Sequence, residues 1–135
     1  MFLLDTNVVS EPTKLRPHRN VVSWLQQQAS NDIFVSVITI CEIVRGVEQL
    51  PASGKREKLS AWLEAMGTPI FFGTMLDVTL PVAVEWGRMQ ARHRHTLPRN
   101  DALIAATALV YNLTVVTRNE RDFAGLSVRV VNPWT

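Results

Sequence analysis

Four acidic residues stand where an apolar run of the sequence ends or where a helical pattern begins. They are Asp5, Glu42, Asp101 and Asp122. Carboxylates that share one partly desolvated site repel each other strongly, so such a group needs a cation between its members. If the fold brings these positions together, the chain is a metal-dependent enzyme.

The donor types predict which ion would fit. The three histidines, His18, His93 and His95, show no HExxH spacing, so a zinc site is not indicated. Carboxylates without matched histidine or cysteine donors suit a hard, oxygen-seeking ion, Mg²⁺ or Mn²⁺. Such an ion activates water as a nucleophile and stabilises charge on a phosphodiester.

Each acid also has a purely structural interpretation. Thr39 and Glu42 match a capping box, in which Glu42 would reach back to the start of its helix. Asp101 could cap a helix or complement its dipole, Asp122 could close an Asx-turn, and Asp5 could start a turn. One shared cation site explains all four positions more economically than four separate causes.

The hydrophobic pattern predicts an α/β domain. Apolar runs predict strands over residues 1–4, 33–38, 75–78, 114–117 and 127–131. Helical periodicity predicts helices over residues 20–29, 39–50, about 55–66, 81–94 and 101–111, with a loop over 10–20. Strands that alternate with helices form parallel pairs, so we expect a three-layer α/β/α domain with a central, mostly parallel five-stranded sheet. At 135 residues, the whole chain (1–135) is expected to form one domain.

The predicted sheet would gather the acids. In open parallel sheets, ligands bind at the carboxyl ends of the strands. Asp5 and Asp122 follow predicted strands, whereas Glu42 and Asp101 lie near the starts of predicted helices. We therefore expect all four near one rim of the sheet.

A basic stretch without any acid runs from residue 88 to 99. Its arginines are Arg88, Arg92, Arg94 and Arg99. A basic flank beside an acidic centre is compatible with binding a phosphate backbone, and these arginines are candidate RNA contacts. The alternative is a solvated helix face whose arginine stems cover apolar surface.

The remaining composition bounds the cellular setting. Hydrophobic residues make up 47% and charged residues 19% of the chain, which is typical of a folded globular protein. The single cysteine, Cys41, excludes an intramolecular disulfide and is expected to be a buried thiol. No secretion signal or membrane span is recognisable, so a cytoplasmic location is expected.

Five segments in this order resemble one known family. LLDTNVVSE, VITICEIVRG, PRNDALIAATAL, VVTRNERDF and a closing VNPW are similar to PIN-domain ribonucleases, and among these to VapC-type or FitB-type toxins of bacterial toxin–antitoxin pairs. The resemblance spans essentially the whole chain. It implies a five-stranded parallel sheet, Mg²⁺- or Mn²⁺-dependent RNA cleavage, a homodimer, and inhibition by a cognate antitoxin that inserts a segment into the active groove.

The resemblance also implies roles for individual positions. Asp5 and Asp101 match the main metal-binding acids, and Glu42 and Asp122 match further or water-mediated ligands. Four polar neighbours match supporting positions: Thr6, Asn7, Thr117 and Asn119.

Two other functions compete with this hypothesis. A non-catalytic PIN-like module would bind RNA or protein without cutting it, but such modules lose acids that this chain keeps. Haloacid-dehalogenase-like phosphatases also carry an aspartate after the first strand. They need a second aspartate two residues on, where this chain has Asn7.

Overall fold

Five strands form a single, fully parallel sheet in a computed structural model that describes residues 1–66, 73–93 and 95–135. Their order across the sheet is β3-β2-β1-β4-β5. The strands are β1 (Phe2–Leu4), β2 (Ile33–Ser36), β3 (Thr74–Leu76), β4 (Thr114–Val116) and β5 (Arg129–Val131). The predicted five-stranded sheet is thus confirmed.

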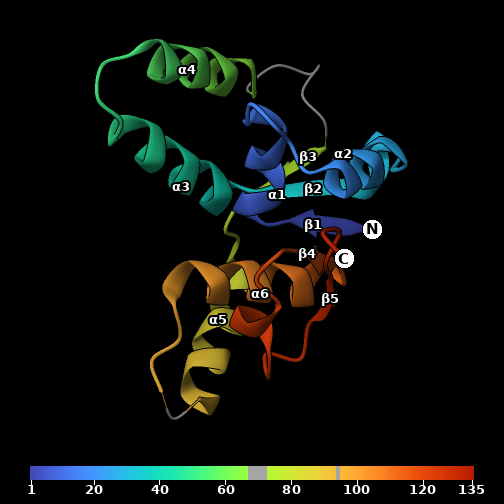
Figure 1. Cartoon of the computed structure of the whole chain (residues 1–135). Helices are drawn as coiled ribbons and strands as arrows, with labels where there is room; N and C mark the ends of the chain where they lie inside the picture. The colour runs from blue at the N-terminus through green and yellow to red at the C-terminus, as the bar shows by residue number, and fades with distance from the viewer. Residues whose placement is uncertain (67–72, 94) are drawn as a thin grey trace.

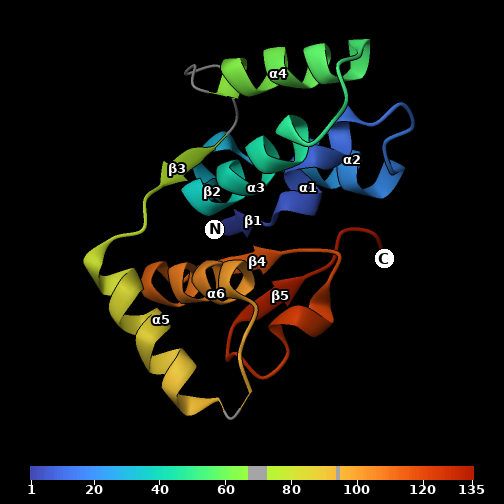
Figure 2. The same cartoon turned by 90° about the vertical axis from the view of Figure 1, so that its left-hand side faces the viewer.

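Helices cover both faces of this sheet. They are α1 (Thr6–Ser10), α2 (Arg19–Gln26), α3 (Val37–Glu48), α4 (Gly54–Met66), α5 (Leu80–Arg92) and α6 (Arg99–Tyr111). Three short 3-10 turns add η1 (Glu11–Thr13), η2 (Ser30–Asp32) and η3 (Glu120–Phe123). Helices α1 to α4 lie on one side of the sheet, and α5 and α6 lie on the other, as Figures 1 and 2 show. The predicted three-layer α/β/α arrangement is confirmed.

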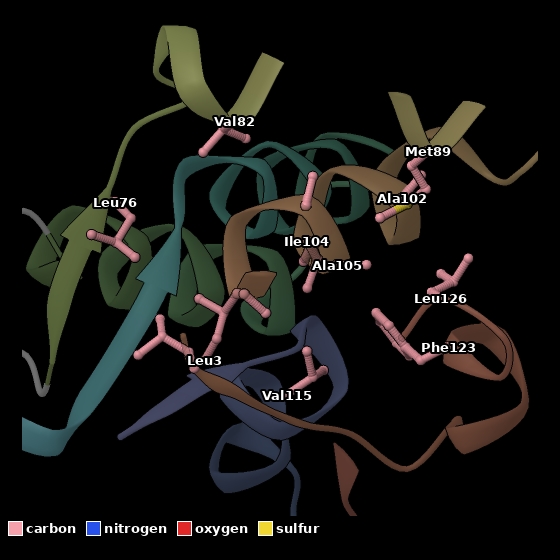
Figure 3. Close-up of a cluster of buried hydrophobic side chains, with 13 residues drawn as sticks. Leu3, Leu76, Val82, Met89, Ala102, Ile104, Ala105, Val115, Phe123 and Leu126 are labelled. Atoms are coloured by element: carbon pink, nitrogen blue, oxygen red, sulfur yellow. The ribbon is translucent and has the colours of Figure 1, made fainter. Parts of the chain in front are cut away.

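Alternation along the strands divides the core in two. Leu3 and Val115 point toward α5 and α6, whereas their neighbours Leu4 and Val116 point toward α1 to α3; all four side chains are fully buried. Figure 3 shows the first of these clusters, where Phe123 of η3 joins the helices against the sheet. This alternation follows from the two-residue period of a strand whose two faces are both covered.

Helix α6 packs closely because its residues are small. Its residues from Ala102 to Ala108 are all buried, four of them alanines. The helix ends at Asn112, whose left-handed backbone (φ 54°) caps it. Asp101, in the first turn of α6, is therefore carried on an element fixed by its packing.

The strand order has a switch point between β1 and β4. From β1 the chain proceeds through β2 to β3 in one direction, then crosses the sheet through α5 and α6 to β4 and β5. The connections therefore leave β1 and β4 toward opposite sides, which is a topological switch point. Ligands of open α/β sheets bind at such points, beyond the carboxyl ends of the strands.

Three local predictions were wrong. The segment before residue 10 contains helix α1, which the sequence analysis did not predict, and η1 occupies part of the predicted loop. Strand β2 ends at Ser36 rather than residue 38, because the Ser36 hydroxyl accepts a hydrogen bond from the Ile38 amide (3.1 Å) and caps α3. Cys41 is exposed, because the buried face of α3 is formed by Thr39, Ile43 and Val47.

Other boundaries agree more closely. Helix α2 runs from residue 19 to 26 instead of 20 to 29, and β3 begins one residue earlier than predicted. Arg94, the predicted end of the helix over residues 81–94, lies outside the described residues. No helix in the described part of the chain has both the length and the apolar character needed to cross a bilayer.

Candidate active site

Asp5 lies at the carboxyl end of β1, beside β4. Its amide donates to the Val116 carbonyl (2.9 Å), which extends the β1–β4 pairing by one residue. Its carboxylate caps α1: Oδ1 accepts from the Thr6 amide at 2.8 Å. The end of β1 and the start of α1 therefore both hold Asp5 in place. The residue is 6% exposed.

Two polar side chains hold the other carboxylate oxygen of Asp5. Thr117, fully buried at the end of β4, donates from Oγ1 to Oδ2 of Asp5 at 2.7 Å. Asn7 donates from Nδ2 to the same oxygen and to the Thr117 hydroxyl, each at 3.3 Å. The Thr117 hydroxyl also accepts from the Asn119 amide at 3.0 Å. All four predicted supporting residues thus belong to one network around Asp5, with Thr6 and Asn119 taking part through their backbone amides.

Glu42 lies in the second turn of α3. Because Ser36 caps this helix, Glu42 is too far from the first turn to form the capping box with Thr39, and that interpretation is wrong. Burial raises the pKa of Glu42, and the charge of Asp5 adds to this effect. Thr6, Asn100 and Arg45 oppose the rise and favour the charged form. Glu42 therefore faces α1 and the start of α6, in line with the packing of α3 against both helices.

Asp101 has a strongly raised pKa. It stands at the third position of α6, where no side chain caps the helix. Burial raises its pKa to about 6, and the negative charges of Asp5, Asp122 and Glu42 contribute to that rise. Asp122, in η3, also acts on Asp5, whose pKa is raised chiefly by burial. The charges of the other three predicted acids therefore all reach Asp101, so the fold gathers the four acids at one rim of the sheet.

The acids do not, however, surround a single point as they stand. Within the described residues, no three histidine, cysteine, aspartate or glutamate side chains form a group that could hold a metal ion. Glu42 and Asp101 are only half-buried, so their side chains have room to turn. Burial, with the charges of neighbouring carboxylates, raises the pKa values of Asp5, Glu42 and Asp101, so a bound cation would favour their charged forms.

The donor set itself fits a hard cation. Asp5 already accepts three hydrogen bonds, and a carboxylate has roughly four acceptor positions, so one remains on Oδ1. The buried Thr6 hydroxyl favours the charged form of Glu42 but makes no hydrogen bond of standard geometry in the described chain. Uncompensated carboxylates and a buried oxygen without a hydrogen-bond partner are what an oxygen-seeking ion would satisfy.

The basic stretch is only partly free. Arg92 is paired with Glu85 across α5 (2.8 Å), an acid that lies just before the stretch. Arg88 and Arg99 are exposed, and Arg99 begins α6 two residues before Asp101. Arg94 lies outside the described residues. Of the candidate RNA contacts, Arg99 is thus the one that stands nearest in the sequence to an acid of the site.

Two neighbours of the site were missed by sequence reasoning. Asn100 lies beside Glu42, and its position next to Asp101 at a helix start was the available signal. Asn132, near the carboxyl terminus, donates from Nδ2 to Oε2 of Glu120 at 3.2 Å. Glu120 begins η3 and is a carboxylate in addition to the four predicted acids, and this hydrogen bond restrains it. Nothing in the sequence pattern indicated that second contact.

A family model and several known proteins match the chain over nearly its whole length. A family model described as PIN domain matches residues 2–128. Toxin FitB of Neisseria gonorrhoeae is 38% identical over 137 residues, with 99% of each chain covered. VapC ribonuclease Y4jK of Sinorhizobium fredii is 31% identical over 137 residues and covers 99% of this chain and 98% of its own.

Solved structures show the same fold. A structure of FitAB bound to an IR36 DNA fragment matches with a TM-score of 0.88 and 36% identity, over 100% of this chain and 96% of the other. A crystal structure of FitAcB from Neisseria gonorrhoeae matches with a TM-score of 0.87 and 38% identity, over 99% of both chains. The chain belongs to the PIN-domain family.

Proposed function

We propose that this protein is a Mg²⁺- or Mn²⁺-dependent endoribonuclease that acts as the toxin of a toxin–antitoxin pair in the cytoplasm. The observation that carries the proposal is the gathering of Asp5, Glu42, Asp101 and Asp122 around the β1–β4 switch point, where the charges of the other three acids help burial to raise the pKa of Asp101. Similarity to a toxin and to a ribonuclease over nearly the full length supports the same conclusion.

The acids would divide the work. Asp5 and Asp101 would be the main ligands, with Glu42 and Asp122 as further or water-mediated ligands. Bound there, Mg²⁺ or Mn²⁺ would supply an activated water and charge stabilisation at the scissile phosphate. Asp5 is held in place by Thr6, Asn7 and Thr117, so it would not have to be ordered during the reaction.

The reaction would be hydrolysis of a phosphodiester bond. A divalent cation beside Asp101 would lower the pKa of about 6 that its carboxylate has without the ion, so Asp101 would stay charged as a ligand. Water would attack the phosphorus, the P–O3′ bond would break, and the products would be a 3′-hydroxyl and a 5′-phosphate. Asn100 and Thr6 would keep Glu42 charged beside it.

A groove next to the acids supports an inhibitory protein partner. It has a volume of about 690 Å³ between α1, α3 and α4, and its wall is mostly apolar, with Ile43, Val47, Leu59 and Trp62 among its residues. Glu42 also lines it, so a segment docked there would reach the candidate site. An antitoxin that fills this groove would cover Glu42, and three lysines along the groove favour an acidic partner surface.

We also propose that two copies of the chain pair. Several apolar side chains of β3, the following loop and α5 are exposed, including Leu80 at 78% and Val84 at 43%. Such a surface favours association. Light scattering of the purified chain tests this: a homodimer is expected, and a monomer at micromolar concentration would refute the pairing.

The decisive test of the enzyme is RNA cleavage by three proteins. Asp5→Asn and Asp101→Asn should each lose cleavage with Mg²⁺ present. Asp32→Asn should keep it, because Asp32 lies at the amino end of β2, away from the carboxyl ends of the strands. Loss of activity on chelation, with recovery on adding Mg²⁺ or Mn²⁺, should accompany this pattern. Full activity of either site variant would defeat the proposal.

One observation favours a second candidate, a module that binds without cutting. Among the described residues, no three acids form a group that could hold a metal ion, and the same would be true of a degenerate site. Calorimetric titration separates the two functions: binding of Mg²⁺ or Mn²⁺ that is weakened in Asp5→Asn supports the enzyme. No heat of binding with either ion supports the module.

A further inference from the structure

Arg118 is attached to the network that holds Asp5. It follows Thr117 at the carboxyl end of β4, and its amide donates to Oδ1 of Asn7 at 3.3 Å. The same Asn7 side chain donates to Asp5 and to Thr117. The backbone of Arg118 is therefore fixed at the edge of the candidate active site.

The guanidinium of Arg118 is also held, although it is exposed. Its central carbon lies 5.6 Å from the centre of the Trp134 ring, within the range of a cation–π contact. Three salt bridges are formed within the described residues, and Arg118 takes part in none of them. It is thus an ordered cation without an acidic partner in the described chain.

Trp134 is a rigid platform for this contact. Its amide donates to Oδ1 of Asn132 (3.0 Å), and its carbonyl accepts from Nδ2 of Asn20 on α2 (3.4 Å). Its half-buried ring packs against the apolar cluster beneath α1 to α4, beside the ring of His18 (6.4 Å between centres). The end of the chain is therefore folded back toward the loop after β4.

An arginine held beside an aromatic ring remains able to bind phosphate. The cation–π contact with Trp134 uses none of the five N–H donors of the guanidinium, so two of them remain to match two phosphate oxygens. A cluster of carboxylates repels the RNA backbone, so a fixed cation beside it is needed to draw the strand in.

We propose that Arg118 binds a phosphate of the RNA strand next to the carboxylates, and that Trp134 is a positioning residue that holds Arg118 for this contact. The inference rests on the proposed ribonuclease function. The competing explanation is that the Arg118–Trp134 contact only fastens the end of the chain. In that case its loss would alter stability but not RNA binding.

The test measures RNA binding separately from cleavage. All proteins carry Asp5→Asn, and the probes are bulk transfer RNA and a labelled single-stranded RNA of mixed sequence. Binding is followed by anisotropy from about 50 to 200 mM salt. Arg118→Ala is compared with Arg129→Ala, which removes the same charge at the amino end of β5, where Arg129 contacts Asn112.

The two variants should differ in a specific way. Arg118→Ala should weaken binding roughly tenfold and reduce the slope of log affinity against log salt by about 0.7, the value for one phosphate of a single strand. Arg118→Lys should keep the slope but bind less tightly, because it retains the charge and loses the forked donors. Arg129→Ala should match the parent protein.

A double-mutant cycle tests the role of Trp134. Trp134→Leu should weaken RNA binding by about two- to fivefold, with Trp134→Phe between it and the parent. In the Arg118→Ala background, Trp134→Leu should have no further effect on binding. A tryptophan that only fastens the end of the chain would leave RNA binding unchanged when it is replaced, and a tryptophan that acts independently of Arg118 would give additive effects; either result would overturn its positioning role.

Equal affinity and equal slope for Arg118→Ala and Arg129→Ala would overturn the inference, as would failure of the parent protein to bind either RNA. The ribonuclease proposal is judged independently, by cleavage with the wild-type chain and Mg²⁺. If the wild type cleaves RNA but Arg118→Ala behaves like its control, only the Arg118 assignment falls.

Discussion

Replacing Asp101 with asparagine should stabilise the protein while removing its activity. Asp101 keeps a half-buried charge beside Asp5, Asp122 and Glu42, and this raises its pKa to about 6. Asparagine has nearly the same shape and no charge. The substitution therefore removes electrostatic repulsion and desolvation cost without creating a cavity.

The size of the effect follows from the difference between the folded and unfolded states. The pKa of Asp101 rises from 3.8 to about 6, and a tenfold change in proton affinity corresponds to about 1.4 kcal/mol, so ionisation opposes folding by at most ~3 kcal/mol. Because the side chain is only half-buried, solvent screening reduces this to ~1.5 kcal/mol.

The sign of the pH dependence follows from proton binding. Between pH 4 and 6 the folded protein keeps the Asp101 proton while the unfolded chain releases it, so rising pH lowers the stability of the wild type. Asparagine has no proton to lose. The variant should therefore be more stable than the wild type by about 1.5 kcal/mol at pH 8, and by roughly half of that at pH 5.

Urea unfolding followed by tryptophan fluorescence measures this difference. Samples at pH 5 and pH 8 should contain a chelator, and Asp32→Asn provides a matched exposed aspartate on the opposite edge of the sheet. Adding Mg²⁺ should then stabilise the wild type more than Asp101→Asn, because the variant lacks one proposed ligand. An Asp101→Asn protein that is no more stable than Asp32→Asn at pH 8 would refute the reasoning.

Three further substitutions test the surroundings of the site. Asn7→Ala removes the donor to Asp5 and the acceptor for the Arg118 amide, so the free energy of unfolding should fall by about 1–2 kcal/mol, measured by urea titration. Burial alone would raise the pKa of Glu11, but hydrogen bonds from Lys14 and the His18 amide outweigh it and lower that pKa. Glu11→Gln should therefore be destabilising at pH 7, and thermal melting should show the loss shrinking as pH falls below 4.5. Gly73→Ala should lower the melting temperature, because Gly73 has a φ of +91° and a Cβ there would lie 2.9 Å from the Ile33 carbonyl oxygen; an unchanged melting temperature would contradict this.

Strand positions were predictable because they are short, apolar and bounded by polar residues. Leu3 and Leu4 are buried on opposite faces, so the first strand has no polar alternation, and only a covered parallel sheet explains such a run. The position of Asp5 followed from the same pattern. Helix α1 was missed because its five residues include two β-branched valines, and it depends on the Asp5 cap and on packing of Val8 and Val9.

Surface exposure was harder to predict than secondary structure. Helical periodicity placed Cys41 among apolar residues, but α3 buries a stripe at every fourth residue, and Cys41 lies outside that stripe. The pairing of Arg92 with Glu85 also escaped prediction, because the two residues lie seven positions apart and the acid falls outside the basic stretch. Both outcomes depend on which side of a helix faces the sheet, and composition does not contain that information.

The start of α3 shows why a local motif can mislead at a functional site. Thr39 and Glu42 have capping-box spacing, yet Ser36 is the residue that ends β2 and caps the helix. The helix thus starts three residues before the position that the capping box requires, and Glu42 moves from its first turn into its second. There the Glu42 carboxylate lies near Thr6 and Asn100. It does not bind the first amides of α3, because the Ser36 hydroxyl already caps that helix. A serine cap at the sheet edge therefore leaves Glu42 available for the acidic cluster, and Ser36→Ala should weaken both the helix start and the placement of Glu42.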